Sequence, residues 1–398
     1  MTRRLWFMLL CGVLIVLVSN GFRQAFGIFL RPISVDMEIG RQVFGFVIAS
    51  QTLLYGLAQP IAGIFADRFG AVRVIVVGAL AYAVGLWWMS LAADAFELYL
   101  SLGIMIGLGL SGVTQVIILG AVGKVVPSER RGVVFGTVIA AGSLGMFIMV
   151  PSLQGLLDVF GWREALVLMA ILMAALPLLT VGLRIDAAGA LDGSRQSLRE
   201  AVREARGHSG YVLLAVGFFV CGFHVTFIAT HFPAYLADND VSGTAAAYAF
   251  GVIGLFNIIG AYAFGALGDR FRKKNVLTLI YFLRAVVMTI LLLVPITDVS
   301  ALVLGAALGM VWLATVPLTS GIVAQVFRTR HFSMLFGVVF MSHQIGGFCG
   351  AWLGGYIFDA TQSYDLMWGA SVVLGLVAAA LHWPISDRPL ARLAERTA

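Results

Sequence analysis

The chain has 398 residues and a formal net charge of +6; 60% of its residues are hydrophobic and only 12% are charged. A soluble domain carries about 25% charged residues. This composition, with a mean hydropathy of +0.97, excludes a soluble globular protein and predicts an all-α polytopic membrane protein.

The N-terminal sequence MTRRLWFMLL starts like a secretory signal peptide, but its apolar run continues to about residue 30. A signal peptide has a shorter apolar core, about 7–15 residues, and then a cleavage site of small residues. We therefore expect a retained first helix. This run contains Arg23, whose guanidinium keeps its charge in any protein environment. An unpartnered arginine in hydrocarbon costs at least ~2.5 kcal/mol, so Arg23 needs an explanation.

Twelve apolar runs are each long enough to cross a bilayer, which takes about 20 residues of helix. They lie at about 5–30, 42–65, 72–93, 97–121, 132–157, 164–184, 211–236, 243–267, 275–297, 301–326, 332–358 and 364–385. Because the number of runs is even, we expect both termini on the same side of the membrane.

The basic residues between these runs are biased to one side. Of the 26 lysines and arginines, 21 lie in the two tails and in the loops after even-numbered runs. Three lie in the opposite loops and two lie inside runs. Basic loops stay in the cytoplasm, so we expect both termini there, in a bacterial inner membrane. The bias also accounts for the basic pI of about 9.4 without a nucleic-acid partner.

A polar stretch, 185–210, separates an N-terminal half, 1–184, from a C-terminal half, 211–398. It contains SRQSLREAVREARG, in which Ser197 and Glu200 form a capping box ahead of a narrow apolar stripe. We expect a cytoplasmic linker with a short amphipathic helix, and a plain linking role is preferred to a regulatory one.

The two halves repeat each other in sequence. GIFADRFGAVR follows the second run and GALGDRFRKK follows the eighth, which places Asp67 and Asp269 202 residues apart. FGTV and FGVV begin the fifth and eleventh runs, and Asp158 and Asp359 end them at an offset of 201 residues. Four landmarks at nearly one offset indicate a duplicated six-span unit.

The first of these loops resembles the signature of the major facilitator superfamily, G-x-x-x-D-R-x-G-x-R. Its positions are occupied by Gly63, Asp67, Arg68, Gly70 and Arg73. The resemblance implies twelve transmembrane helices in two six-helix pseudo-repeats, with a central cavity between the halves. It also implies a conformational latch that stabilises the outward-facing state.

In such a latch the glycine permits close helix contact, and Asp67 can meet a helix N-terminus and basic partners across the interface. Asp269 and Arg270 occupy the same positions in the second copy. That copy is degenerate, because Arg272 replaces the late glycine.

Within the superfamily, GFRQAFGIFL resembles the first helix of monocarboxylate transporters and oxalate:formate antiporters. Gly-Trp-Arg at 161–163 and GAWLGGYIFD at 350–359 add to the resemblance. The animal carriers use a lysine in the first helix and an aspartate and an arginine in the eighth. The corresponding residues here are Gln24, Asn257 and Ala261, so the charged site of those carriers does not transfer intact.

The candidate substrate-binding residues share a polar or aromatic character on the central and flanking spans that the resemblance implies. They are Asn20, Arg23, Gln24, Gln115, His224, His231, Asn257, Trp312, His343 and Gln344, with Arg284 of the ninth span. All twenty acidic residues lie at span ends or in loops. The three histidines in this set are therefore the candidate proton carriers, although polar packing explains each equally well.

We interpret Arg23 as the group that binds an anion, because a cation facing a water-filled cavity without an internal partner attracts one. A snorkelling arginine near the outer interface and a gating or packing residue are the alternatives. For Arg284, packing against carbonyl groups of a neighbouring helix is preferred to substrate contact, since the resemblance implies that the ninth span lies on the outside of the bundle.

The predicted function is a secondary transporter of a small organic anion, a carboxylate, working by alternating access. Transport is either coupled to protons through histidine or proceeds by exchange, and an exporter of amphipathic compounds is the alternative. We expect a monomer in the lipid bilayer, with neither catalytic residues nor a metal or cofactor site. Cys11, Cys221 and Cys349 are interpreted as small packing residues.

Overall fold

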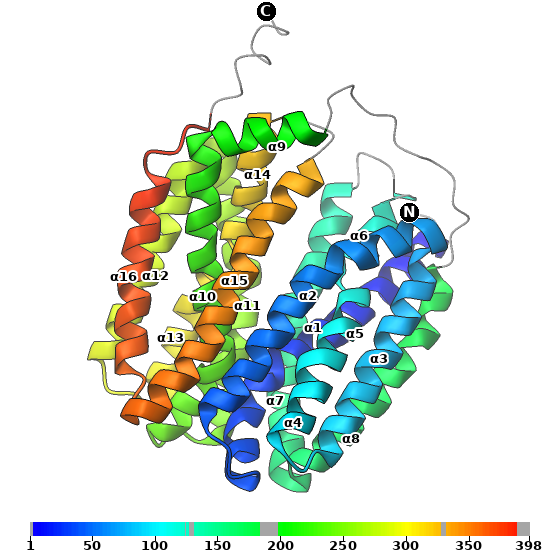
Figure 1. Cartoon of the computed structure of the whole chain (residues 1–398), viewed down its shortest axis with the longest axis vertical. Helices are drawn as coiled ribbons and strands as arrows, with labels where there is room; N and C mark the ends of the chain where they lie inside the picture. The colour runs from blue at the N-terminus through cyan, green and yellow to red at the C-terminus, as the bar shows by residue number, and fades with distance from the viewer. Residues whose placement is uncertain (1–2, 124, 127–130, 184–197, 328–331, 388–398) are drawn as a thin grey trace, which may run out of the picture.

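The computed structural model describes residues 3–123, 125–126, 131–183, 198–327 and 332–387, and its regular elements are all helices (Figure 1). They are α1 (Arg3–Asp36), α2 (Arg41–Phe69), α3 (Ala71–Leu91), α4 (Ala95–Leu98), η1 (Tyr99–Ile106), α5 (Gly107–Gly112), α6 (Gln115–Gly123), α7 (Arg131–Phe160), α8 (Trp162–Ala175), η3 (Leu176–Leu183), α9 (Leu198–Gly207), α10 (Ser209–Asp238), α11 (Gly243–Arg270), α12 (Lys273–Leu293), α13 (Asp298–Met310), α14 (Thr315–Phe327), α15 (Phe332–Thr361) and α16 (Asp365–His382).

Within those residues, 12 segments are long and apolar enough to cross a membrane, which confirms the predicted number. Three of them are built from more than one helix. The fourth span joins α4, the π-helical η1, α5 and α6; the sixth joins α8 and the 3-10 helix η3; and the tenth joins α13 and α14. The short helix α9 lies in the expected linker, whereas Ser197 of the expected capping box lies outside the described residues.

The third, sixth, ninth and twelfth spans turn large apolar side chains outward. Val77 and Trp87 of α3, Ile171 of α8, Leu293 of α12 and Val373 of α16 are all more than half exposed in the isolated chain. A soluble protein rarely exposes so continuous an apolar surface, but lipid covers it favourably. These outward-facing side chains of the four spans are therefore placed to contact lipid.

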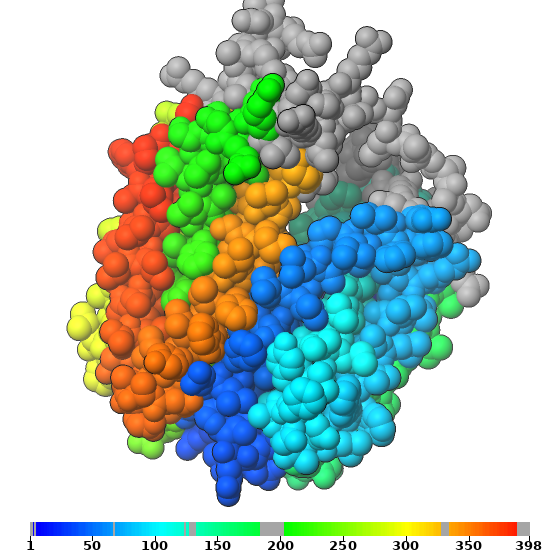
Figure 2. All heavy atoms as spheres, viewed as in Figure 1, coloured from blue at the N-terminus to red at the C-terminus, as the bar shows by residue number. Residues whose placement is uncertain are grey.

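The helices form two groups, α1 to η3 and α10 to α16, which pack together through α2 with α15, α7 with α11, and α1 with α10 (Figure 1). We call the end of the molecule where α1 begins and α16 ends the terminal end, and the opposite end the far end. The two groups converge toward the far end, where the spheres of α2 lie directly against those of α15 (Figure 2).

Two glycines make the tight connections between neighbouring spans possible. Gly70, between α2 and α3, has a φ of 90°, and Gly161, between α7 and α8, has a φ of 86°. A side chain is strained at these angles, whereas glycine adopts them freely. This gives a local physical reason for the late glycine of the first signature loop and for the glycine of Gly-Trp-Arg.

Candidate functional site

Arg23 lies on the face of α1 that turns toward both the fourth span and the C-terminal half. Ser19 and Gly27, one helical turn on either side, share this face. The Ser19 hydroxyl donates to the Val113 carbonyl at 3.2 Å, in the interruption between α5 and α6. A Cβ atom on Gly27 would collide with the Ala229 carbonyl of α10. Arg23 therefore projects near the junction of the two halves.

The Arg23 side chain is only partly buried, and its guanidinium carbon lies 5.0 Å from the centre of the Tyr55 ring on α2. Among the described residues it has neither an ion pair nor a hydrogen-bonding partner. A cation–π contact stabilises the charge by about 0.5–2 kcal/mol but leaves the N–H donors of the guanidinium free. The guanidinium therefore has hydrogen-bond donors that no described residue uses.

The neighbouring polar residues of the N-terminal half are engaged in different ways. Asn20 donates to the Gly142 carbonyl of α7 at 3.0 Å, and the Gln24 amide approaches the Met146 sulfur of the same helix at 3.6 Å. Both therefore attach α1 to α7. Gln115, the first residue of α6, is exposed, so its side chain is free for another contact.

The fourth and tenth spans are interrupted at corresponding places. Helix α5 ends at Gly112 and α6 begins at Gln115, while α13 ends at Met310 and α14 begins at Thr315. An interruption frees backbone N–H and C=O groups that a continuous helix would pair. In membrane carriers, interrupted helices of this kind lie near the bilayer midplane, where substrates bind.

Side chains from neighbouring helices pair the free groups of the tenth span. The Asn257 carbonyl oxygen on α11 accepts from the Leu313 N–H at 2.9 Å. Arg284 on α12 donates to the carbonyls of Val311 and Trp312, both at 2.5 Å. Arg284 is only 1% exposed. This is the contact with a neighbour's carbonyls that the packing interpretation describes, and a substrate does not reach Arg284 in this conformation.

Trp312, in the same interruption, is 2% exposed, and its indole nitrogen has no partner among the described residues. Asn257 has a second bond, from its amide nitrogen to the Ser143 hydroxyl of α7 at 2.8 Å. It therefore connects the interrupted tenth span to the N-terminal half. The residue that replaces the aspartate of the animal carriers is thus a structural bridge between the halves in this conformation.

The three histidines are buried and have different hydrogen-bonding partners. His224 bonds the Ser371 carbonyl of α16 through Nε2 at 2.9 Å, and His343 bonds the side chain of Gln344 through Nδ1 at 3.1 Å. Gln344 also donates to the Thr52 carbonyl of α2 at 2.9 Å, across the interface of the halves. Among the described residues, no hydrogen bond joins one of these histidines to another.

His231 differs because it touches the contact between the halves at the far end. Its Nε2 lies 2.7 Å from the Ala351 carbonyl, and its Nδ1 lies 3.0 Å from the Tyr364 hydroxyl. Tyr364 in turn accepts a hydrogen bond from Arg41 at 3.1 Å. A buried histidine of the C-terminal half is therefore linked through one tyrosine to an arginine of the N-terminal half.

We call Arg41, Asp238, Asp359 and Tyr364 the far-end cluster. Arg41 forms a two-pronged ion pair with Asp238, at 2.5 and 2.7 Å, and its guanidinium lies over the Phe358 ring at 3.7 Å. Planar pairing of arginine with a carboxylate adds geometric specificity to the charge attraction. From the sequence, Arg41 was counted only as one of the three basic residues in the opposite loops. Asp238 and Tyr364 were not among the candidate site residues.

Asp359 of the far-end cluster caps α2 from the other half of the chain. The N-cap residue of α2 is Gly40, which has no side chain to accept from the first N–H groups of the helix. The Asp359 carboxylate accepts from the N–H groups of Arg41 and Gln42 at 3.0 and 2.8 Å instead. A carboxylate at a helix N-terminus also interacts favourably with the helix dipole, so this cap binds the two halves together.

The predicted latch lies at the terminal end, where those of its side chains that the structure describes make no comparable contact in this conformation. A Cβ atom on Gly63 would meet nothing within 4 Å, so the close helix contact expected there is not formed. Arg68 is exposed, and Arg73 donates to the Phe69 carbonyl within its own loop at 3.2 Å. The side chain of Asp67 lies outside the described residues, so its role as a latch stays a prediction.

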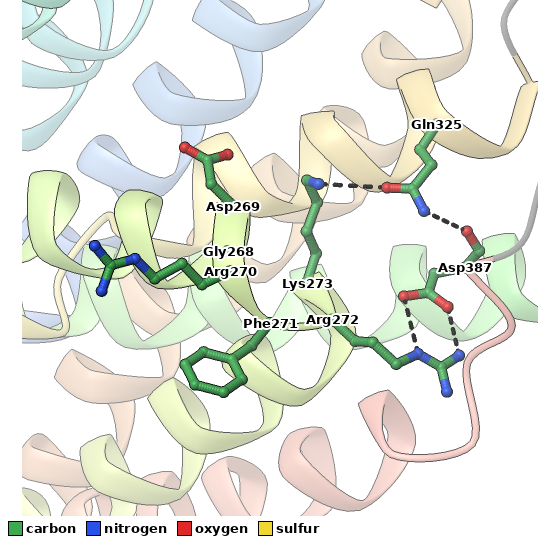
Figure 3. Close-up of a pocket in the computed structure, with 8 residues that line it drawn as sticks. All are labelled: Gly268, Asp269, Arg270, Phe271, Arg272, Lys273, Gln325 and Asp387. Carbon is green, nitrogen blue, oxygen red and sulfur yellow. Dashed lines mark hydrogen bonds and ion pairs between the residues drawn. The ribbon is translucent and has the colours of Figure 1, made fainter.

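The second copy of the loop borders a pocket of about 550 Å³ at the terminal end (Figure 3). Asp269 and Arg270 are exposed there and point away from the bonded residues. Arg272, which replaces the late glycine, pairs with Asp387 at 2.5 Å, and Gln325 donates to the Asp387 carbonyl at 2.8 Å. Burial acts to raise the pKa of Asp387, but the hydrogen bond and charge of Arg272 hold it below its ordinary value.

Comparison of the sequence with known proteins gives matches along the whole chain. A family model described as Major Facilitator Superfamily matches residues 9–316 and 214–398. The "Uncharacterized MFS-type transporter YcxA" of Bacillus subtilis (strain 168) is 25% identical over 98% of this chain and 97% of its own. Monocarboxylate transporter 13 of Bos taurus is 24% identical over 90% of this chain and 84% of its own.

Solved structures share the fold. A bacterial homolog to the human lysosomal transporter Spinster, in an inward-facing and unoccupied conformation, has a TM-score of 0.79 at 16% identity, with 98% of this chain and 99% of that chain covered. A D-xylose–proton symporter has a TM-score of 0.74 at 15% identity, with 97% and 99% covered. At these identities the likeness concerns the fold alone.

Proposed function

The chain belongs to the Major Facilitator Superfamily, and we propose that it carries a small organic anion, a carboxylate, across the membrane by alternating access. Its family and its 12 spans make it a multi-pass secondary transporter. The anionic substrate is the proposed part, and the observation that carries it is the unpaired guanidinium of Arg23 beside the junction of the halves.

The distribution of charged residues within the spans supports an anionic substrate. All twenty acidic residues of the chain lie at span ends or in loops, so none of them can neutralise Arg23 from within the membrane. Arg284, the other embedded arginine, is held by backbone carbonyls, whereas Arg23 has the Tyr55 ring and no hydrogen-bonding partner among the described residues. A carboxylate would supply the charge-assisted hydrogen bonds that Arg23 lacks.

The names of the relatives point in the same direction. Several curated relatives are monocarboxylate transporters, including number 13 of Bos taurus and number 12 of Mus musculus, at 24% identity each. The present chain has Gln24, Asn257 and Ala261 where the resemblance implies charged residues in those carriers. We therefore propose a carboxylate bound mainly through Arg23, with Gln115 as an exposed polar neighbour.

We place both termini in the cytoplasm of a bacterium, because 21 of 26 basic residues lie on that side of the predicted spans. The far end then faces the periplasm. Since the far-end cluster joins the halves there, and a Cβ atom on Gly63 would meet nothing within 4 Å at the terminal end, we assign this conformation as inward-facing. The latch residues would engage in the opposite state.

Transport is driven either by protons or by exchange of one anion for another. If protons are coupled, His231 is the best placed of the three histidines. It alone lies one hydrogen bond from a tyrosine that contacts the opposite half, so a change in its protonation would alter the contact that closes the far end. Exchange needs no such group.

Replacement of Arg23 tests the anionic substrate. Arg23→Gln removes a charge-assisted contact worth ~1.5–3 kcal/mol, so affinity for a carboxylate should fall about 10- to 150-fold. Arg23→Lys should restore only part of it, because an ammonium keeps the charge but loses the planar fork. The measurement is ligand affinity of purified protein in detergent, from the rise in thermal stability with ligand concentration.

Arg3→Gln is the matched control, since Arg3 is an exposed arginine at the start of the same helix. It should leave affinity unchanged. A snorkelling Arg23 predicts a different result: lysine would replace it fully, and glutamine would lower the yield of folded protein without changing affinity. Unchanged affinity in Arg23→Gln would remove the case for an anion and favour the export of amphipathic compounds.

A further inference from the structure

The second copy of the signature loop differs from the first in charge as well as in its late glycine. At the offset of 202 residues, the sequence GAV at 70–72 corresponds to RKK at 272–274. Three uncharged residues are thus replaced by three basic ones. The change accounts for the degenerate signature of this copy, and it leaves the added charges without a role in a latch.

Two of the added residues keep hydrogen-bond donors free at the terminal end. Lys273, the first residue of α12, donates to the Gln325 side chain of α14 at 3.3 Å (Figure 3). Lys274 donates to the carbonyl of Trp383, directly after α16, at 2.8 Å. An ammonium group has three donors. Each lysine therefore has N–H groups that no described residue uses, and Lys274 places its charge between α12 and α16.

Positive charge exceeds negative charge on this surface. Arg270 borders the pocket of about 550 Å³ and has no hydrogen-bond or ion-pair partner among the described residues. Of the two carboxylates, Asp387 is paired with Arg272, and Asp269 points away from the bonded residues. Residues 269–274 and Asp387 together carry four basic groups against two acidic ones. The surface is thus suited to an anion.

Exposed aromatic and apolar side chains adjoin these charges. Phe271 is 62% exposed and Trp383 is 67% exposed. Farther along the same two spans, Phe282 of α12 and Val373 of α16 are exposed as well. Aromatic side chains are typical of the boundary between membrane and water. The basic groups, the aromatic side chains and the apolar faces of α12 and α16 match, in this order, the headgroup, the boundary region and the acyl chains of a lipid.

We propose that this surface binds an anionic phospholipid, with its phosphate on Lys273, Lys274 and Arg270 and its acyl chains along α12 and α16. Basic pockets between membrane helices suit such headgroups. A zwitterionic phospholipid has the same phosphate but balances it with its own cation, so it binds less tightly. The proposal requires a chain that spans the membrane, and it depends neither on the substrate nor on Arg23.

Thermal unfolding of the purified, delipidated protein in detergent tests this site, because a ligand of the folded state raises the melting temperature with its concentration. Phosphatidylglycerol should give a larger rise than phosphatidylcholine with the same acyl chains. Lys273→Gln combined with Lys274→Gln should weaken the apparent affinity for phosphatidylglycerol about 25-fold, since each basic residue near an anionic lipid contributes roughly fivefold. If this double variant does not fold, Lys274→Gln alone should weaken the affinity about fivefold.

The matched control is Arg203→Gln combined with Arg206→Gln, which removes the same charge from exposed positions of α9 at the same end of the molecule (Figure 1). It should leave the affinity unchanged, and Lys273→Arg combined with Lys274→Arg should retain it. An equal rise with phosphatidylcholine, or an equal loss in the α9 variant, would overturn the proposal. Inorganic phosphate at the same concentration should give no rise. An equal rise with inorganic phosphate would assign the surface to free phosphate-bearing solutes and overturn the assignment to a lipid.

Discussion

The two arginines that lie within spans are stabilised in different ways, although both carry a charge inside the membrane region. Arg284 places its charge against the carbonyls of an interrupted helix and is almost fully buried. Arg23 remains partly exposed, with a single aromatic contact. The sequence distinguished them by span, since the ninth span lies at the periphery and the first lies centrally. It could not say which carbonyls Arg284 meets, because those depend on where the tenth span breaks.

The pair of Arg272 and Asp387 gives a prediction that depends on pH. Because Arg272 holds the pKa of Asp387 below its ordinary value, the ionised pair stabilises the fold at neutral pH. That contribution is lost as the pH falls through the pKa of Asp387 in the folded protein. Asp387→Asn should therefore lower the melting temperature by a few degrees at neutral pH. The difference from the unmodified protein should begin to shrink below about pH 4 and should disappear once the pH lies below the pKa of Asp387 in the folded protein, as followed by thermal unfolding in detergent.

Asp269→Asn is the control for this measurement, because Asp269 borders the same pocket but is exposed and points away from the bonded residues. It should leave the melting temperature unchanged at every pH. A difference between Asp387→Asn and the unmodified protein that persists at acidic pH would mean that the asparagine disturbs packing rather than an ion pair.

The contacts of the far-end cluster could not be predicted from the sequence. Asp359 was recognised as a landmark that ends the eleventh span, yet its contact with the N-terminus of α2 joins residues more than 300 positions apart. A signal was present in the sequence, since Gly40 offers the second span no side-chain cap while Ser242 caps α11 locally. That contrast indicates a missing cap, but it does not name the residue that supplies one.

At the scale of elements, the twelve spans were predictable because length and apolar composition alone define them. The interruptions of the fourth and tenth spans were not, since both runs stay apolar throughout. Their local causes are visible afterwards: GLGLSG precedes the first break, and Pro317 follows the second. Glycine weakens a helix, and proline cannot donate to the preceding turn. The free backbone groups are then held by side chains whose partners only the fold reveals.

Asn257 tests the importance of the second interruption. Asn257→Leu leaves the partly buried Leu313 N–H without an acceptor and also removes the bond to Ser143. Leaving a buried donor unpaired costs about 1–3 kcal/mol, so the free energy of unfolding should fall by that amount. Ser143→Ala removes only the contact between the halves and should cost less. The measurement is thermal or denaturant unfolding in detergent, and an equal, negligible loss in both variants would show that the break needs no such bond.

At the scale of the whole molecule, the sequence repeat predicted the fold and the loop charges predicted an orientation. Both patterns can be recognised in the sequence without knowing any contact between distant residues. Reporter proteins fused after the second and eighth spans should be cytoplasmic, and those fused after the first and seventh should be periplasmic. The expectation rests on the 21 basic residues on one side of the spans. The opposite pattern of reporter activity would reverse the assignment of this conformation as inward-facing.

Which end of the molecule is closed could not be predicted, because the competing states of a carrier share one sequence and differ by a few kcal/mol. The structure shows the far end closed by the ion pair of Arg41 with Asp238 and by the Asp359 cap on α2. The latch of the signature loop, with Asp67, is expected to favour the other state. The far-end closure and the latch should therefore have opposite effects on the equilibrium between the inward-facing and outward-facing states.

Asp359→Asn weakens the far-end closure by removing the charge and one acceptor from the N-terminus of α2. Caps and charges at helix N-termini contribute about 0.5–2 kcal/mol. The equilibrium constant that favours the closed far end should therefore fall by up to about 30-fold. A cysteine introduced at Thr230, which is 2% exposed here, should then react faster with a reagent added from the periplasm.

The repeat counterpart, Asp158, is the matched control: it is exposed and bonds Gln154 of its own helix. Asp158→Asn should leave the rate unchanged, and Asp67→Asn should slow it, because losing the latch favours the state seen here. If Asp359→Asn labels no faster than Asp158→Asn, the cap on α2 does not hold the far end closed.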